Sequence, residues 1–249
     1  MIIEWSSGCA RATNDTRDFA LNQKPVLLLH CNGTDAATSF PDSSPSNHTV
    51  TANGNAQVDT AQSKWGGAAA LFDGTGDYLS IPDSANWDVV GSATDKQTID
   101  FWVKHTDHVG SETYLTQMET MPTDRWFIRH VHGTGILFEV SSTTTIITLG
   151  PAGEIADTNW HHVAVCKVAA EYGLYKDGTQ IAHTSDVSTD TLAGSLYIGC
   201  DGGTAPMGGY FAGHIEEIRI VPANVFNASP VVGLTDKIMV PSRQYISWR

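Results

Sequence analysis

Short strand-like segments recur along this chain at a spacing of roughly 8–12 residues, with turn-forming residues between them. Between two of these segments, Asp177-Gly178 predicts a hairpin with a two-residue type I′ turn. No amphipathic helix accompanies the strands, and a single helical turn is expected at 85–89. The pattern predicts an all-β fold. The strands are expected at 26–31, 68–72, 78–81, 97–104, 113–118, 125–130, 135–140, 144–149, 160–168, 172–176, 179–183, 195–199 and 213–220.

Two of the expected strands indicate how the layers are arranged. In 97–104, Ile99, Phe101 and Val103 share one face and alternate with Asp100, Trp102 and Lys104, which predicts one face turned to the core. The segment 160–168 is apolar on both faces. Such a strand is expected at the centre of a sheet that is covered on each side.

Length and charge restrict the classes of partner. A chain of 249 residues can bury a core without disulfides or metals to support it. The formal net charge of −13 disfavours nucleic acid and anionic membrane surfaces, and no cluster of Lys or Arg offers a local exception. Neutral glycans and other proteins stay open as partners, and the many carboxylates leave room for a bound cation such as Ca²⁺.

The N-terminal sequence has no basic region followed by an apolar one, so no signal peptide is expected. The apolar run 26–29 is far too short to cross a bilayer, and synthesis in a cytoplasm is expected. The cysteines Cys9, Cys31, Cys166 and Cys200 lack CxxC spacing, which disfavours a zinc site. Cys166 and Cys200 fall in strands and are expected to be buried thiols; a disulfide stays open.

The chain divides into three parts by composition. Residues 1–24 show little periodicity and are expected to form an N-terminal arm, either docked on a neighbouring subunit or frayed. Residues 25–222 hold the strands and are expected to form one domain. Residues 223–249 are punctuated by proline and are expected to run as a C-terminal extended tail.

An ordered set of segments resembles the laminin-G-like jelly-roll family, a branch of the concanavalin A-like lectin and glucanase fold. Each segment is weak alone, but together they cover roughly residues 25–222. The resemblance implies a two-sheet antiparallel jelly-roll sandwich. The segments are Leu27-Leu28-Leu29-His30-Cys31-Asn32-Gly33, Asp42-Ser43-Ser44-Pro45, Lys64-Trp65-Gly66-Gly67-Ala68-Ala69-Ala70-Leu71-Phe72-Asp73-Gly74, Asp77-Tyr78-Leu79-Ser80-Ile81-Pro82, Ile99-Asp100-Phe101-Trp102-Val103, Trp160-His161-His162-Val163-Ala164-Val165, Tyr175-Lys176-Asp177-Gly178, Leu196-Tyr197-Ile198-Gly199 and Phe211-Ala212-Gly213-His214-Ile215-Glu216-Glu217-Ile218-Arg219-Ile220.

This version of the pattern is similar to domains of tailed-bacteriophage virion proteins. The resemblance implies a non-catalytic structural protein of the virion, as a capsid decoration or a tail or fibre component. Its expected partners are other virion proteins, further copies of itself in a homo-oligomer, and glycans. The alternative is a free-standing carbohydrate-binding lectin or adhesin module of a cellular organism, and fold analogy alone does not decide between them.

The resemblance also implies a structural calcium ion, because the family often holds a cation between the opening loop, the glycine-rich turn and the last strand. Glu216 shares a face with Ile218 and Ile220 in a regular strand, so its carboxylate is expected to point inward. A solvated position at the frayed start of the strand is the alternative. The family usually has Asp at this position, which changes the reach of the carboxylate. The expected ligands are Asp42, the backbone at Asp73 and Gly74, and Glu216.

A glycan-binding surface is the second candidate site. Sugars are held by aromatic rings stacked on their apolar faces and by polar groups that bond their hydroxyls. Core or subunit contacts are the alternative for the two aromatic residues. The candidates are Arg125, Trp126, Arg129 and His130 on one expected strand, and Tyr210 on a glycine-rich loop.

Histidine pairs are the third candidate. His130 and His132 share a face of an expected strand, but no third ligand follows at a suitable spacing, so ordinary histidines are favoured. The other pairs are His105 with His108, and His161 with His162.

The sequence disfavours catalysis. A glucanase on this fold needs two carboxylates on one strand face. Glu216 and Glu217 are adjacent and are expected on opposite faces. The motifs of common hydrolases and nucleotide-binding enzymes are absent, so no enzyme activity is expected.

Overall fold

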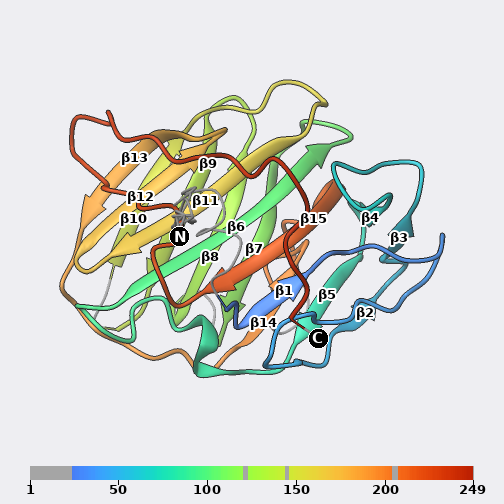
Figure 1. Cartoon of the computed structure of the whole chain (residues 1–249), viewed down its shortest axis with the longest axis horizontal. Coiled ribbons are helices and arrows are strands. Elements are labelled where there is room, and N and C mark those ends of the chain that lie inside the picture. The colour runs from blue at the N-terminus through green and yellow to red at the C-terminus, as the bar shows by residue number, and fades with distance from the viewer. Residues whose placement is uncertain (1–23, 120–122, 144–145, 204–206, 249) are drawn as a thin grey trace, which may run out of the picture.

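The computed structural model describes residues 24–119, 123–143, 146–203 and 207–248, and fifteen strands in them form two stacked sheets (Figure 1). Every strand pair within each sheet is antiparallel, which confirms the predicted all-β sandwich. The predicted N-terminal arm lies outside the described residues except for Lys24.

Sheet A is the larger sheet. In it β1 (Leu27–Leu29) pairs with the last strand, β15 (Ala212–Val221), so the two ends of the domain meet in one sheet. Its other strands, in order across the sheet, are β13 (Thr179–Ser185), β12 (Glu171–Lys176), β11 (His161–Val168), β6 (Lys96–His105), β15 (Ala212–Val221), β4 (Ala69–Asp73) and β3 (Gln57–Asp59).

Sheet B packs against the inner face of sheet A. A short 3-10 helix, Ala85–Trp87, follows its strand β5 (Tyr78–Ile81) and confirms the expected helical turn. The strands, in order across the sheet, are β10 (Ile146–Ala152), β9 (Gly135–Ser141), β8 (Arg125–Val131), β7 (Ser111–Met118), β14 (Ser195–Ile198), β5 (Tyr78–Ile81) and β2 (Thr51–Asn53).

Each strand expected from the sequence is present, and two further strands, β2 and β3, are not among the predictions. Both are three residues long and mostly polar, so they lack the apolar alternation that identifies a strand. The predicted hairpin turn is confirmed: Asp177 and Gly178 have φ angles of 49° and 80°, as a type I′ turn requires.

The core lies between the sheets, as the alternation in β6 predicts. Ile99, Phe101 and Val103 are all buried in the largest apolar cluster, together with Trp126 and Phe138 from sheet B. An apolar core of this kind is the main source of stability in a sandwich.

A second apolar cluster covers the outer face of sheet A. The C-terminal segment 222–248 crosses this face as the red trace in Figure 1, and Phe226 and Ile238 pack there on Cys166 and Tyr175. This cover explains why β11 is apolar on both faces, as the sequence indicates for a central strand. Farther along the segment, Tyr245 packs on Leu28 of β1.

Beneath this cover lies a buried ion pair. Arg219 Nε donates to Asp100 Oδ1 at 2.9 Å, and the Arg219 guanidinium lies 3.8 Å from the centre of the Tyr245 ring. His162 Nε2 lies 3.2 Å from Asp100 Oδ2, and the Tyr245 hydroxyl donates to the same oxygen. Burial alone would raise the pKa of Asp100, but Arg219 and His162 lower it below its ordinary value.

The described cysteines are buried and free, as expected for Cys166 and Cys200. Burial raises the pKa of the Cys200 thiol to about 12, so this sulfur stays protonated at neutral pH. In the part of the chain that the structure describes, no helix has the length and hydropathy needed to cross a membrane.

We expect Asp100→Asn to lower the free energy of unfolding by about 3–5 kcal/mol, because it leaves the Arg219 charge buried without its counterion. Equilibrium urea denaturation measures this difference. Asp83→Asn is the matched control, because Asp83 is exposed, and it should change stability by less than about 0.5 kcal/mol. Equal stability of the two variants would show that the ion pair is dispensable.

Candidate functional site

Asp42, a predicted calcium ligand, is instead an internal anchor of its loop. Its buried carboxylate accepts hydrogen bonds from the amides of Leu28, Ser44 and His48 at 2.8–3.0 Å, and from the Ser44 hydroxyl at 2.9 Å. Four donors occupy both oxygens and fix the loop 42–48 against β1. The lone pairs of the Asp42 carboxylate are therefore occupied by internal donors, and its role as a calcium ligand stays a prediction.

A β-bulge changes the direction of Glu216. Glu217 has a φ angle of 53°, and the pairing of β15 with β6 shifts register between Glu216 and Arg219. The bulge inserts one residue, so Glu216 lies on the outer face although Ile218 faces the core. The expectation that Glu216 points inward was wrong, because it assumed a regular strand.

The outer position of Glu216 is nevertheless buried, because the loop before β4 covers it. Its Oε1 accepts a hydrogen bond from the Trp65 amide at 2.5 Å, whereas its Oε2 has no hydrogen-bond partner. Burial raises the pKa of this carboxyl to about 8. Glu217 makes separate contacts, to His30 Nδ1 at 2.7 Å and to the amide of Tyr245.

The remaining predicted calcium residues lie at the end of β4 and in the turn that follows it. Asp73 is exposed and its Oδ1 accepts from the Thr75 amide at 2.7 Å, while Gly74 has a φ angle of 82° and lies against Ala212. Among the described residues, the group of ligand-type side chains close enough to share an ion contains neither Asp42, Asp73 nor Glu216. Calcium binding thus stays a prediction without an assembled site.

The candidates on β8 point to opposite faces of sheet B. Trp126 and His130 face the core and are fully buried, so neither can contact a glycan, contrary to the prediction. The Trp126 indole donates to the Trp87 carbonyl oxygen at 2.8 Å and to Gln117 Oε1 at 2.9 Å. The two-residue period of a strand separates these two residues from Arg125 and Arg129.

Arg125 and Arg129 lie on the outer face of sheet B with Phe127 between them. The Arg129 guanidinium lies 3.8 Å from the centre of the Phe127 ring and that of Arg125 lies 5.1 Å from it. Arg129 Nη2 donates to Asp201 Oδ1 at 2.9 Å, and the Thr113 hydroxyl donates to the same oxygen. These contacts hold charged donors and acceptors in fixed positions.

Three tyrosines lie beside this arginine cluster. Tyr197 of β14 and Tyr78 of β5 have ring centroids 6.1 Å apart, and Tyr197 packs closely on Gly202. Burial, with Cys200, Tyr210 and Tyr197 nearby, raises the pKa of Tyr78. The predicted residue Tyr210 follows Gly209, which packs on Asp201 and whose carbonyl oxygen accepts from the Thr113 amide at 2.8 Å. Tyr210 therefore lies in the same region as Tyr78 and Tyr197, which the sequence-based candidates omit.

The outer face of sheet B consequently carries partly exposed aromatic rings next to paired charges. We call this surface the arginine–tyrosine face; it comprises the partly exposed Tyr78, Arg125, Arg129, Tyr197, Asp201 and Tyr210, together with the buried Thr113 and Phe127.

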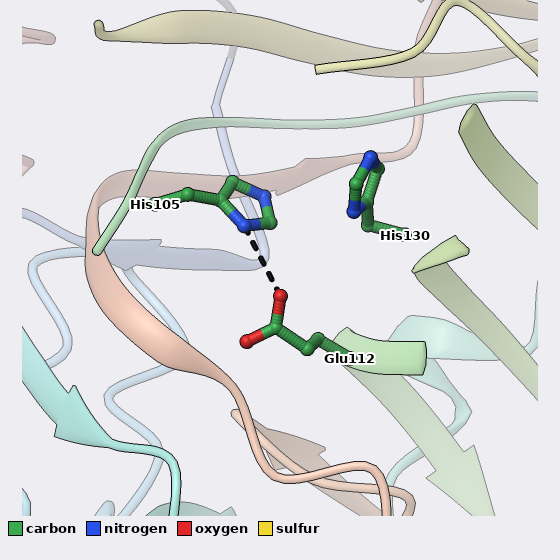
Figure 2. A group of neighbouring side chains, drawn as sticks. All are labelled: His105, Glu112 and His130. Carbon is green, nitrogen blue, oxygen red and sulfur yellow. Dashed lines mark ion pairs between the residues drawn. The ribbon is translucent and has the colours of Figure 1, made fainter. Parts of the chain in front are cut away.

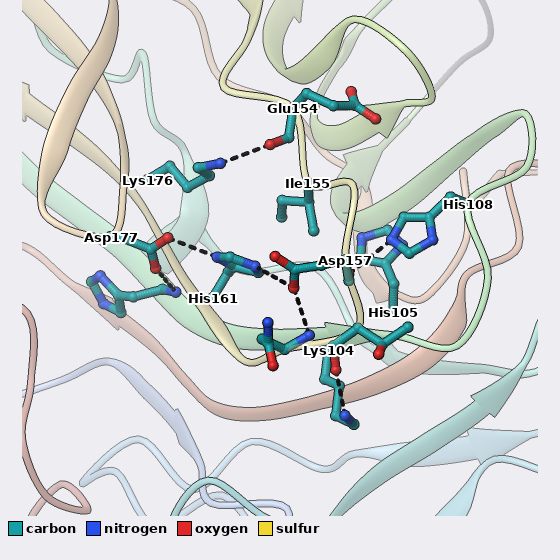
Figure 3. A network of polar contacts seen from close by, with 12 residues as sticks. Lys104, His105, His108, Glu154, Ile155, Asp157, His161, Lys176 and Asp177 are labelled. Atoms are coloured by element: carbon teal, nitrogen blue, oxygen red, sulfur yellow. Dashed lines mark hydrogen bonds and ion pairs between the residues drawn. The ribbon is translucent and has the colours of Figure 1, made fainter.

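Of the predicted histidine pairs, His105 and His108 stack with ring centroids 5.1 Å apart, and His130 and His132 both lie beside Glu154, whereas His161 and His162 have different surroundings. His161 bonds to Asp177 Oδ2 at 2.7 Å and to Asp157 Oδ1 at 3.1 Å (Figure 3), and the first of these bonds contributes most to the raised pKa of His161. His162 lies beneath the C-terminal segment against Asp100. In the core, His130 lies near His105, and burial followed by the charge of His105 lowers the pKa of His130 to about 4.

Comparison with known proteins places the chain among lectin-like folds. The sequence model of the concanavalin A-like lectin/glucanases superfamily matches residues 73–228. A search of curated proteins finds no significant match.

Similar solved structures include binding domains of botulinum neurotoxins. The binding domain of botulinum neurotoxin serotype D shares 16% identity at a TM-score of 0.61, covering 82% of this chain and 49% of that one. The binding domain of neurotoxin DC in complex with rat synaptotagmin II shares 13% at a TM-score of 0.61 (80% and 48% covered). The same domain in complex with SialylT shares 12% at a TM-score of 0.57 (80% and 48% covered). The chain thus spans about half the length of these structures, and the likeness shows the fold.

We expect the stability of the protein to fall as the pH rises from about 5 to 8, in part through Glu216. The folded carboxyl keeps its proton up to a pKa of about 8, whereas the unfolded one loses it near its ordinary value of 4.5. Glu216→Gln should remove this part of the pH dependence, as measured by urea denaturation at pH 5, 7 and 9. Glu119→Gln, at an exposed site, should leave the profile unchanged. Parallel profiles for wild type and Glu216→Gln would contradict the assignment.

Proposed function

Because the chain belongs to the concanavalin A-like lectin/glucanases superfamily, we propose that it is a non-catalytic recognition domain that binds a carbohydrate on its arginine–tyrosine face. The observation that carries the proposal is the grouping of Tyr78, Tyr197 and Tyr210 beside the Arg129–Asp201 pair, on the sheet opposite the one covered by the C-terminal segment.

The chemistry of this face suits a sugar. Tyrosine rings stack on the apolar faces of pyranose rings, and their hydroxyls bond to water or to ligand. The Arg129–Asp201 pair offers donors and acceptors of opposite charge a few ångströms apart, which suits the hydroxyls of a glycan. Since Arg129 rests on Phe127 and binds Asp201, its orientation is set before a ligand arrives, which reduces the entropy lost on binding.

The similar neurotoxin domains support recognition as the general role. Structures of them are described in complex with rat synaptotagmin II and with SialylT, and this chain spans about half the length of those domains. For this chain, the tyrosines beside paired charges favour the carbohydrate.

A lack of catalysis is part of the proposal. Glu216 and Glu217, adjacent acidic residues in β15, are both buried, and each contacts structural partners. A glycosidase instead needs two carboxylates that flank a bound sugar.

The role in a virion, as a capsid decoration or a tail or fibre component, is the more specific part of the proposal and rests on the sequence resemblance alone. Residues 1–24 would supply the assembly contact, since the C-terminal segment packs on its own domain through Phe226 and Tyr245.

Deleting residues 1–24 should abolish the homo-oligomer and leave glycan binding unchanged. The two are measured by light scattering and by a glycan array. A full-length protein that is already monomeric at micromolar concentration would favour the free-standing lectin instead.

We expect Tyr197→Ala and Arg129→Ala each to weaken binding to an array-identified glycan at least tenfold, about 1.4 kcal/mol. Arg129→Lys should recover part of the loss, because it keeps the charge but not the planar geometry. Lys96→Ala, at the exposed start of β6 in sheet A, is the matched control. Titration calorimetry measures the affinities. A glycan that binds both alanine variants as tightly as wild type would place recognition elsewhere.

A further inference from the structure

Three side chains that commonly bind metals converge inside the sandwich, away from the arginine–tyrosine face. His105 ends β6, Glu112 lies near the start of β7, and His130 lies near the end of β8. Their candidate ligand atoms all lie within 4.8 Å of one another, and Figure 2 shows the three side chains turned toward a common centre. Each residue is buried, with at most 3% of its surface exposed.

The atoms that face the centre carry few other contacts. His105 Nδ1 lies 3.1 Å from Glu112 Oε2, the ion pair drawn in Figure 2, and 3.3 Å from the Asp107 carbonyl oxygen. His130 Nδ1 is buried and has no hydrogen-bond partner. A buried polar atom without a partner costs free energy, so it signals a missing contact.

The atoms that point away from the centre are held by neighbouring groups. His105 Nε2 lies 2.7 Å from the Tyr114 hydroxyl, and Glu112 Oε1 accepts from the Ala212 amide at 2.8 Å. The Ile155 amide donates to His130 Nε2 at 3.4 Å, and Glu154 Oε2, which has no hydrogen-bond partner, lies 3.2 Å from the same nitrogen. When His130 Nδ1 binds a metal, Nε2 carries the proton and Glu154 Oε2 is in place to accept from it. Histidines that bind metals through one ring nitrogen typically have a carboxylate or another polar group on the other nitrogen.

The segment that supplies Glu154 is itself fixed. Lys176 Nζ donates to the Glu154 carbonyl oxygen at 2.7 Å, and His108 Nε2 bonds to the Asp157 carbonyl oxygen at 2.9 Å (Figure 3). The side chain of Asp157 is fixed as well, because its Oδ1 lies 3.1 Å from His161 Nε2. The outer contact of His130 therefore belongs to an ordered network.

We propose that His105, Glu112 and His130 bind a divalent transition-metal ion, best matched by Zn²⁺, through His105 Nδ1, Glu112 Oε2 and His130 Nδ1. Two imidazole nitrogens and one carboxylate oxygen form a common set of zinc ligands. In tetrahedral coordination neighbouring ligand atoms lie roughly 3.3 Å apart. The candidate ligand atoms lie up to 4.8 Å apart, and rotation of the side chains would bring them to the shorter distance. The Asp107 carbonyl oxygen or a water molecule completes the shell. The ion would link β6 of sheet A to β7 and β8 of sheet B.

The test is metal binding by the full chain after removal of metals with a chelator. Titration calorimetry with ZnCl₂ should show one ion per chain, and CoCl₂ should give the visible absorption of a four-coordinate Co²⁺ ion that Zn²⁺ abolishes. His130→Gln and Glu112→Gln should each weaken zinc binding more than tenfold. His183→Gln is the matched control, because His183 forms a similar but less buried pair with Glu171 at 2.6 Å and should bind like wild type.

Crystals of wild-type protein soaked in ZnCl₂ provide a readout that needs no variant. An anomalous difference peak between His105, Glu112 and His130 would establish the site. The absence of a peak there, or unchanged zinc affinity in a folded His130→Gln variant, would overturn the proposal. Glycan binding is measured separately, so failure of either proposal leaves the other intact.

Discussion

The ion pair between Asp100 and Arg219 lies on the outer face of sheet A, where a sandwich of this kind would otherwise meet water. Two charges are tolerated without solvent only when they are paired and their remaining polar atoms are bonded. His162 and the Tyr245 hydroxyl supply those bonds, and the Tyr245 ring stacks on the guanidinium. The ion pair therefore requires the C-terminal segment, and the segment gains a specific docking point from the ion pair.

This dependence gives the two sheets different surroundings. Sheet A is apolar on both faces around β11 because the segment that carries Phe226 and Ile238 covers it. Sheet B has one face in the core, and its outer face keeps tyrosine and arginine side chains in partial contact with solvent. The asymmetry explains why recognition is proposed on sheet B alone.

The sequence predicts the strands well because alternation and turn chemistry are local properties. The apolar residues of β11 on both faces indicate a cover, but no periodic pattern identifies 222–248 as the segment that supplies it. The bulge at Glu217 could not be predicted from the sequence either. One inserted residue changes which face of the sheet the residues on its two sides point to, although the apolar pattern of the segment remains that of a strand.

For the candidate sites too, local sequence patterns give which face of a strand a residue lies on but not which distant residues meet. Strict alternation along β8 separates Arg129 from Trp126 and could have removed Trp126 from the glycan candidates. The convergence of His105, Glu112 and His130 depends on three strands in two sheets, and only the folded topology reveals it. Tyr78 and Tyr197 likewise meet through the pairing of β5 with β14, across 119 positions of sequence.

The pairing of β1 with β15 has a consequence for biosynthesis. Leu27 pairs with Ile220, and Leu28 packs on Tyr245, so both contacts of β1 are made with residues near the end of the chain. During vectorial synthesis almost the whole domain must leave the ribosome before sheet A can close, since contacts so distant in sequence form late. Until then the nascent chain presents the apolar strand β1 and the charges of Asp100 without their partners, a state suited to capture by a chaperone.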